Sequence, residues 1–147
     1  MTQGRSARGL VAESSLTIDV PAARVWDGLT NPDIIKQYMF GAQMDCDWRE
    51  GSPLVLRGEW EGKTFEDKGT VLRAQKERLL EYTHFSPLSG AEDLPENYHT
   101  VTIELVQDGE RTVLSLAQDN NATEEERDQA ASTWAMMLGT MKDVLEG

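Results

Sequence analysis

The sequence is poor in cysteine, histidine and long apolar runs, and each shortage excludes a class of protein. Its 147 residues contain one cysteine, Cys46, so an internal disulfide is excluded. One cysteine and two histidines that lie far apart form no zinc-binding pattern. No apolar run approaches the roughly 18 residues that a membrane-spanning helix needs. We also find no glycine-rich phosphate loop, nucleophile elbow or dinucleotide-binding fingerprint, and therefore predict no metal site, no cofactor and no catalytic residue.

Basic residues are also scarce, and the acidic excess limits the partners that the chain can have. The 14 lysines and arginines against 26 aspartates and glutamates give a formal net charge of -12. Such a surface repels phosphate backbones and anionic lipid headgroups, so we expect neither a nucleic-acid nor a membrane partner. The N-terminus lacks the apolar run of a secretory signal, which together with the single cysteine predicts a cytoplasmic protein. We expect residues 1–11 to be a flexible lead-in and residues 12–147 to form a single domain.

In most of the chain, polar and apolar residues alternate with the two-residue period of β-strands. Residues 12–20 alternate in polarity, as a half-buried strand does. Two short helices follow, each opened by a proline, and the second ends at Gly41.

Between 42 and 119, alternating apolar residues and turn signals predict five or six antiparallel strands and one long loop over 86–97. The first of these strands is predicted over 42–48, and Asp108-Gly109 predicts the turn of the last hairpin. Gly69, inside one of these strands, suggests a bulge or a sharp bend.

A helical period returns near the C-terminus. Thr123 and Glu126 have the spacing of a capping box, and apolar residues then recur at helical spacing as far as Leu145. One long amphipathic helix can cover the concave face of a bent antiparallel sheet. We therefore predict an α+β fold in which a curved antiparallel sheet of about six to seven strands grips one long C-terminal helix, with two short helices after the first strand.

Three segments carry a family resemblance: IDVPAARVWDGLTNPDIIKQYM, GTVLRAQKERLLEYTHFSP and ASTWAMMLGTMKDVLEG. With the order of elements, they resemble the helix-grip superfamily that includes the START lipid-binding domains and the major birch pollen allergen. The amino-acid sequence is most similar to that of homologues of the heat-shock-protein-90 ATPase activator, over about residues 12–146. The name-giving activators also carry a separate chaperone-binding domain, for which 147 residues leave no room, so the chaperone role does not carry over automatically. The superfamily also contains polyketide cyclases, and its fold alone leaves the function open.

A helix that stands off a curved sheet leaves space for a ligand, and the apolar side chains on both sides are its expected walls. The alternative is that the same side chains fill a solid core, as aromatic and methionine stripes often do. The family resemblance favours the pocket. The predicted ligand-binding residues are Met39 and Phe40 on the second short helix, Trp48, Trp60, Tyr82, His84 and Tyr98 on strands, and Trp134, Met137, Leu138 and Met141 on the closing helix.

The roles of the polar and reactive residues can be interpreted in more than one way. His84 is either a polar anchor or acid–base group inside the pocket, or a core histidine satisfied by a hydrogen bond. His99 is assigned to the surface, and Cys46 is expected to be a buried and inert thiol. Three carboxylates are expected to lie on solvated strand faces: Glu66, Asp67 and Glu81.

Three functions fit these features. The first is binding or carriage of a small hydrophobic or amphipathic ligand in the pocket. The second is an enzyme of the cyclase or dehydratase kind, in which His84 or a tyrosine moves a proton inside the same pocket. The third is a protein-interaction module with a chaperone contact through the outer face of the sheet or the 86–97 loop, and a homodimer stays open as well. A dry apolar cavity favours the first, a buried polar cluster the second, and a filled core with an exposed apolar patch the third.

Overall fold

The computed structural model describes residues 9–147, and its elements follow the predicted order of strand, two short helices, strands and long helix. Most of the predicted lead-in over 1–11 lies outside the described residues, and β1 already begins at Leu10. The elements are β1 (Leu10–Ile18), α1 (Ala22–Thr30), α2 (Pro32–Tyr38), β2 (Gln43–Asp45), β3 (Pro53–Trp60), β4 (Lys63–Gln75), β5 (Leu79–His84), the single-turn helices η1 (Pro87–Ser89) and η2 (Pro95–Asn97), β6 (His99–Asp108), β7 (Arg111–Asn121) and α3 (Glu124–Glu146).

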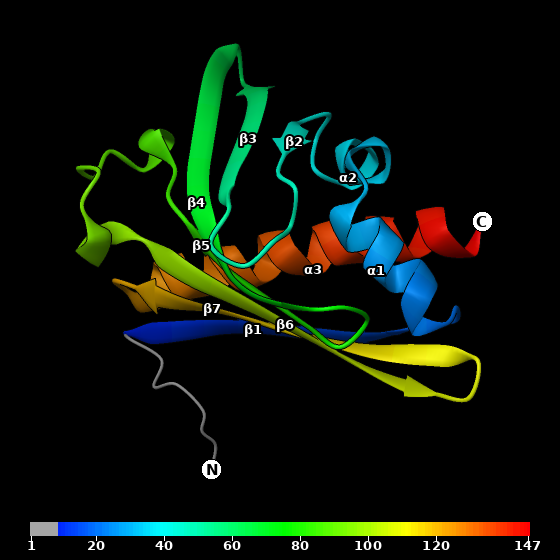
Figure 1. Cartoon of the computed structure of the whole chain (residues 1–147). Coiled ribbons are helices and arrows are strands. Elements are labelled where there is room, and N and C mark those ends of the chain that lie inside the picture. The colour runs from blue at the N-terminus through cyan, green and yellow to red at the C-terminus, as the bar shows by residue number, and fades with distance from the viewer. Residues whose placement is uncertain (1–8) are drawn as a thin grey trace.

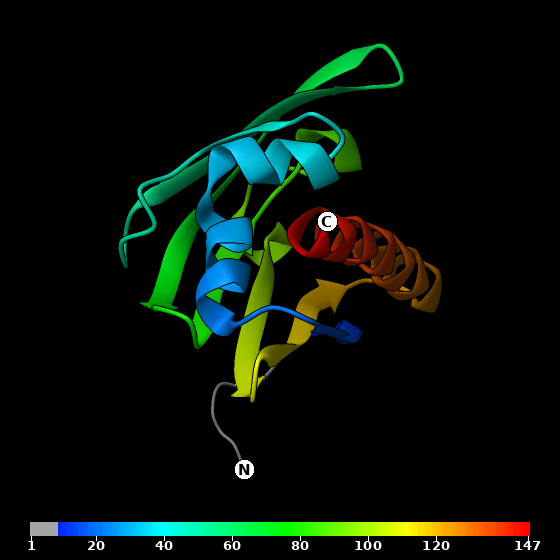
Figure 2. The same ribbon diagram turned by 90° about the vertical axis from the view of Figure 1, so that its right-hand side faces the viewer.

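The strands form one seven-stranded sheet in the order β1-β7-β6-β5-β4-β3-β2. Every neighbouring pair is antiparallel. Figure 1 shows α3 running across the sheet, with α1 and α2 beside its C-terminal end. In the view of Figure 2, the sheet bends around α3, and the β3–β4 hairpin rises on the side opposite β1. The predicted α+β helix-grip architecture is confirmed.

The bend in the sheet is concentrated in β4, where the sequence predicted it. The pairing of β4 with β5 shifts register between Val71 and Arg73, which marks a bulge. Two residues earlier, a Cβ atom on Gly69 would lie only 1.7 Å from the Thr83 carbonyl oxygen. Only glycine permits that close approach of two backbones, so Gly69 lets β4 turn across β5 and gives the sheet its curvature.

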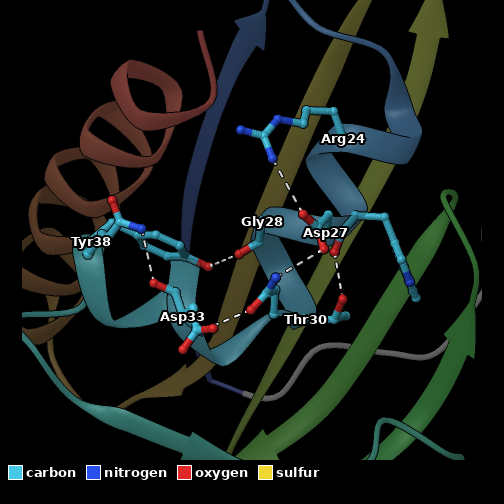
Figure 3. A network of polar contacts seen from close by, with 9 residues as sticks. Arg24, Asp27, Gly28, Thr30, Asp33 and Tyr38 are labelled. Atoms are coloured by element: carbon cyan, nitrogen blue, oxygen red, sulfur yellow. Dashed lines mark hydrogen bonds and ion pairs between the residues drawn. The ribbon is translucent and has the colours of Figure 1, made fainter. Parts of the chain in front are cut away.

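The corner between α1 and α2 is held by short-range hydrogen bonds, which are drawn in Figure 3. The buried Tyr38 hydroxyl donates to the Gly28 carbonyl oxygen at 2.8 Å, and burial raises the pKa of this phenol. The Asn31 side chain accepts from the Asp33 amide at 2.9 Å and caps α2. These hydrogen bonds fix the end of α2. Met39 and Phe40, which follow α2, therefore reach a defined position beside α3.

Helix α3 packs its apolar stripe into the curve of the sheet. The Thr123 hydroxyl accepts a 3.1 Å hydrogen bond from the Glu126 amide, which confirms the predicted start of the helix. Four residues at helical spacing are buried along it: Trp134, Leu138, Met141 and Leu145. No helix within residues 9–147 is long and apolar enough to cross a membrane.

The strand predicted over 42–48 is wrong beyond Asp45. After β2 the backbone leaves the ladder, and Trp48 adopts a positive φ of 60°. Its indole N–H donates to the Thr30 carbonyl oxygen at 3.0 Å, and its amide donates to the Cys46 sulfur at 3.3 Å. These two bonds replace strand pairing. Cys46 is half-buried rather than fully buried, and desolvation raises the pKa of its thiol, which therefore stays protonated at neutral pH.

Candidate ligand pocket

A pocket of about 290 Å³ lies between α3 and the inner face of the sheet. Four parts of the chain provide its walls, and most of the lining side chains are apolar. The lining residues are Met39, Phe40 and Ala42 after α2 together with Met44 in β2, Leu54, Leu56, Phe65 and Asp67 from β3 and β4, Tyr82, His84 and Gln118 from β5 and β7, and Ala130, Thr133, Trp134 and Met137 from α3.

Six of the predicted ligand-binding residues line this pocket: Met39, Phe40, Tyr82, His84, Trp134 and Met137. Trp48 and Leu138 instead line a deeper gap of only about 10 Å³, where Trp48 packs edge-on against Tyr82. Met141 is fully buried in the core. Tyr98 lies away from the pocket and stacks on Phe85. The side chain of Trp60 lies outside the part of the structure that is described.

Sequence reasoning missed the lining residues of β3, β4 and β7, although strand parity gave a signal for some of them. Leu54 and Leu56 share the parity that predicted an apolar strand face, and Leu56 pairs with Asp67 across β3 and β4. Asp67 lies on the inward parity of β4, between Phe65 and Val71. A polar residue at an inward strand position is the signal that could have identified it.

The assignment of Asp67 to a solvated strand face is wrong, since the residue is only 7% exposed. Its carboxylate oxygen Oδ2 lies 2.8 Å from Nε2 of His84, which lines the same pocket. The second oxygen, Oδ1, is buried and has no hydrogen-bond partner among residues 9–147. The pocket thus contains a histidine–aspartate pair in which one acceptor is left open.

The other two carboxylates differ from one another. Glu66 is exposed as predicted and pairs with Arg57 at 2.8 Å. Glu81 is 1% exposed, which corrects the expectation of a solvated face. Strand β5 is central in the sheet, and its neighbours cover this carboxylate: Arg73 donates to it at 3.1 Å and the Thr102 hydroxyl at 2.8 Å.

Neither Tyr98, just before β6, nor His99, its first residue, lies where it was expected. His99, assigned to the surface, is half-buried and stacks on His84 with ring centroids 6.5 Å apart. Its Nδ1 atom donates to the Asp119 carbonyl oxygen at 2.8 Å. Tyr98, expected in the pocket, points to the other face and donates to Asp93 at 2.6 Å. Side chains alternate along a strand, so the inward parity of β6 selects His99 over Tyr98.

The pocket opens toward an outer hollow of about 390 Å³. The two spaces share Phe40, Phe65, Asp67 and Thr133. Large apolar side chains around the hollow are unusually exposed: 49% for Phe40, 47% for Leu88 and 53% for Met136. We call these three residues the apolar rim. Clustered exposed apolar side chains of this kind are typical of surfaces that contact a ligand or another protein.

The chemistry of these walls suits binding of a neutral molecule. Within residues 9–147, no three histidine, cysteine, aspartate or glutamate side chains come together so that they could hold a metal ion. Burial raises the pKa of the Tyr82 hydroxyl, so this group stays neutral at physiological pH. The Gln118 carbonyl oxygen accepts from the Trp134 indole at 2.7 Å, so the amide is fixed against α3.

Comparison with known proteins shows the same fold over nearly the whole chain. The family model described as Activator of Hsp90 ATPase homolog 1-like protein matches residues 19–146. The solution structure of ChR145 from Cytophaga hutchinsonii is 46% identical, with 97% of each chain covered and a TM-score of 0.82. The crystal structure of CalU16 from Micromonospora echinospora is 20% identical, with 96% of this chain and 87% of that chain covered and a TM-score of 0.70. The solution structure of the Aha1 dimer from Colwellia psychrerythraea is 17% identical, with 93% and 96% covered and a TM-score of 0.73. None of the curated proteins matches the sequence.

Proposed function

Because the chain belongs to the family of Activator of Hsp90 ATPase homolog 1-like proteins, we propose that it binds and carries a small hydrophobic or amphipathic ligand in the pocket beneath α3. The observation that carries this proposal is an apolar space of about 290 Å³ that opens through the apolar rim. We place this role in the cytoplasm. A chaperone contact or a homodimer through the apolar rim is compatible with this role. A small ligand can occupy the pocket without either contact.

The size and the walls of the pocket define the ligand. Ligand sites commonly measure about 300–1,000 Å³, so this one suits a single small molecule rather than a long acyl chain. Three methionines line it, Met39, Met44 and Met137, and their flexible thioethers adapt to ligands of different shape. The rigid counterpart is Trp134, whose ring is held by its bond to Gln118. These walls favour a flat, neutral, largely apolar ligand.

The direct test is binding of naphthalene-based fluorophores to the purified protein. We expect one molecule bound per chain with a dissociation constant in the micromolar range, or about -8 kcal/mol. Ligand at one hundred times this constant should raise the free energy of unfolding by about 2.7 kcal/mol. Met137→Trp should fill the pocket and abolish both effects while the chain still folds.

The matched control is Ala135→Trp, which adds the same side chain to the exposed face of the same helix. This variant should bind like the wild type. If Met137→Trp binds as tightly as Ala135→Trp, the ligand site lies elsewhere and the proposal fails. Native mass spectrometry of protein purified from its own host should in addition find a retained small molecule.

A second candidate function is supported by one observation, the Asp67–His84 pair in the pocket wall. A histidine oriented by a carboxylate can take or deliver a proton, as a cyclase or dehydratase would need. The same mass spectrometry separates the two functions. A ligand that is recovered after incubation with the same mass and the same chromatographic retention indicates carriage, and one that has lost water or cyclised indicates catalysis.

A further inference from the structure

The Oδ1 atom of Asp67 is a buried polar atom in the pocket wall that has no hydrogen-bond partner within residues 9–147. The residue as a whole is 7% exposed. A buried carboxylate oxygen without a donor has lost its water and gained nothing in exchange, so such atoms are rare in folded proteins. Because Asp67 lines both the pocket and the outer hollow, a bound molecule is the natural source of the missing donor.

The rest of the carboxylate is held in place. Its Oδ2 atom lies 2.8 Å from Nε2 of His84, whose ring stacks on His99. His99 is in turn anchored on the Asp119 carbonyl oxygen at 2.8 Å. His84 and His99 are therefore positioning residues that fix where Asp67 stands. The torsion about the Cβ–Cγ bond of an aspartate is soft, so a small rotation can turn Oδ1 toward the pocket while Oδ2 stays near His84 and β4 does not move.

We propose that the ligand carries a hydroxyl group that donates its hydrogen to Asp67, while an apolar ring system fills the space against Trp134 and Met137. This inference rests on the proposed binding function and specifies the ligand class. The Gln118 amide lines the same pocket, and since its carbonyl oxygen accepts from Trp134, its NH₂ group is the part that can donate to a ligand oxygen.

Charged donors fit this site less well than a hydroxyl. An ammonium group has three N–H donors, whereas the wall offers one open carboxylate oxygen in mainly apolar surroundings, so two donors would lose water without replacement. A carboxylate ligand would approach Asp67 with like charge. A neutral hydroxyl needs one acceptor for its hydrogen, and the site provides one.

The experiment compares three probes of nearly equal shape by fluorescence titration: naphthalene, 2-methoxynaphthalene and 2-naphthol. Hydrogen bonds to a charged group are the stronger ones, so we expect the wild type to bind 2-naphthol about tenfold or more tightly than 2-methoxynaphthalene. Asp67→Leu should remove this preference. Asp67→Asn retains the shape and a neutral acceptor, so it should reduce the preference to about threefold and serves if the leucine variant does not fold.

The matched control is Glu66→Leu, which removes the neighbouring carboxylate on the exposed side of β4 and should leave the preference unchanged. Naphthalene makes no hydrogen bond, so it should bind equally to the wild type and to Glu66→Leu, and its affinity for each Asp67 variant measures the change in apolar packing against which the preference for 2-naphthol is judged. Equal affinity of the wild type for 2-naphthol and its methyl ether would overturn the inference while leaving the binding function intact. A preference that survives in both Asp67 variants would do the same. Failure of all three probes to bind would overturn the inference together with the binding function.

Discussion

Trp134 links the helix, the sheet and the pocket through a single side chain. Its ring is 8% exposed and lines the pocket, and its indole N–H donates to Gln118 on β7 at 2.7 Å. A buried indole N–H needs an acceptor, which explains why a polar glutamine lies among the apolar residues of this wall. This hydrogen bond thus holds α3 against β7 and fixes the side-chain amide of Gln118, which lines the pocket.

Trp134→Ala should therefore lower the free energy of unfolding by about 3–5 kcal/mol, the usual range for a large aromatic side chain removed from a core. Denaturant titration measures this loss. Met136→Ala, two residues further along the same helix, removes a side chain that is 53% exposed and should change stability by no more than about 0.5 kcal/mol. A loss below about 1 kcal/mol for Trp134→Ala would mean that the indole does not pack as the structure shows.

The chemistry of the pocket was harder to predict from the sequence than its apolar walls. The helical period of α3 was enough to predict Trp134 and Met137, because that pattern is local. Asp67 lies on an inward parity, but its partner His84 is 17 positions away on another strand. Which atoms meet across two strands depends on their register, and β4 contains a bulge that parity alone does not place. The pair is therefore a product of the tertiary structure.

At the scale of elements, β4 determines whether the sheet can curve around α3. It is the longest strand, with 13 residues, and it pairs with β3 along the whole of that hairpin and with β5 beyond the bend. The bend occurs where Gly69 approaches Thr83. The pocket lies on the concave side, so a flatter sheet would pull Phe65 and Asp67 away from α3.

Gly69→Ala should be strongly destabilising, by at least about 3 kcal/mol, or prevent folding. The added Cβ would lie 1.7 Å from the Thr83 carbonyl oxygen and 2.6 Å from its carbon, so the two backbones would have to separate. Gly139→Ala is the matched control: a Cβ there meets nothing within 4 Å, and in a helix alanine is favoured over glycine. This control should raise stability by about 0.5–1 kcal/mol in the same denaturant titration. A similar small effect at both positions would contradict the close approach of β4 and β5.

The elements that the sequence predicted well are those with local signals. The start of α3 follows from the Thr123 cap, and the β6–β7 turn follows from Asp108-Gly109, where Gly109 has a φ of 66°. The segment after β2 was not predictable in this way. Its strand-like alternation is local, but the carbonyl oxygen that captures the Trp48 indole is 18 positions away on α1. A long-range bond there overrides the local pattern.

At the scale of the whole molecule, the net charge of -12 should influence which ligands reach the proposed site. A negative surface lowers the local concentration of anions and leaves neutral molecules unaffected. This electrostatic repulsion extends over a Debye length of about 30 Å at 10 mM salt but only about 8 Å at 150 mM, so added salt weakens it. The buried carboxylate of Asp67 adds a second repulsion that salt hardly screens, because it acts inside the protein.

These two repulsions predict how the protein distinguishes 2-naphthol from 2-naphthoate, which share one ring system and differ in charge at neutral pH. At 10 mM salt, 2-naphthoate should bind at least about tenfold more weakly, since it loses both the donor and the electrostatic match. At 150 mM salt its affinity should rise severalfold without reaching that of 2-naphthol, while 2-naphthol itself should change by less than about twofold. Fluorescence titration at the two salt concentrations measures both effects, and the Asp67→Asn variant separates them. In this variant the affinity for 2-naphthoate should lie closer to that for 2-naphthol at either salt concentration, while the salt dependence of 2-naphthoate binding should remain. Equal binding of the two probes by the wild type at low salt would show that neither the surface charge nor Asp67 acts on the ligand.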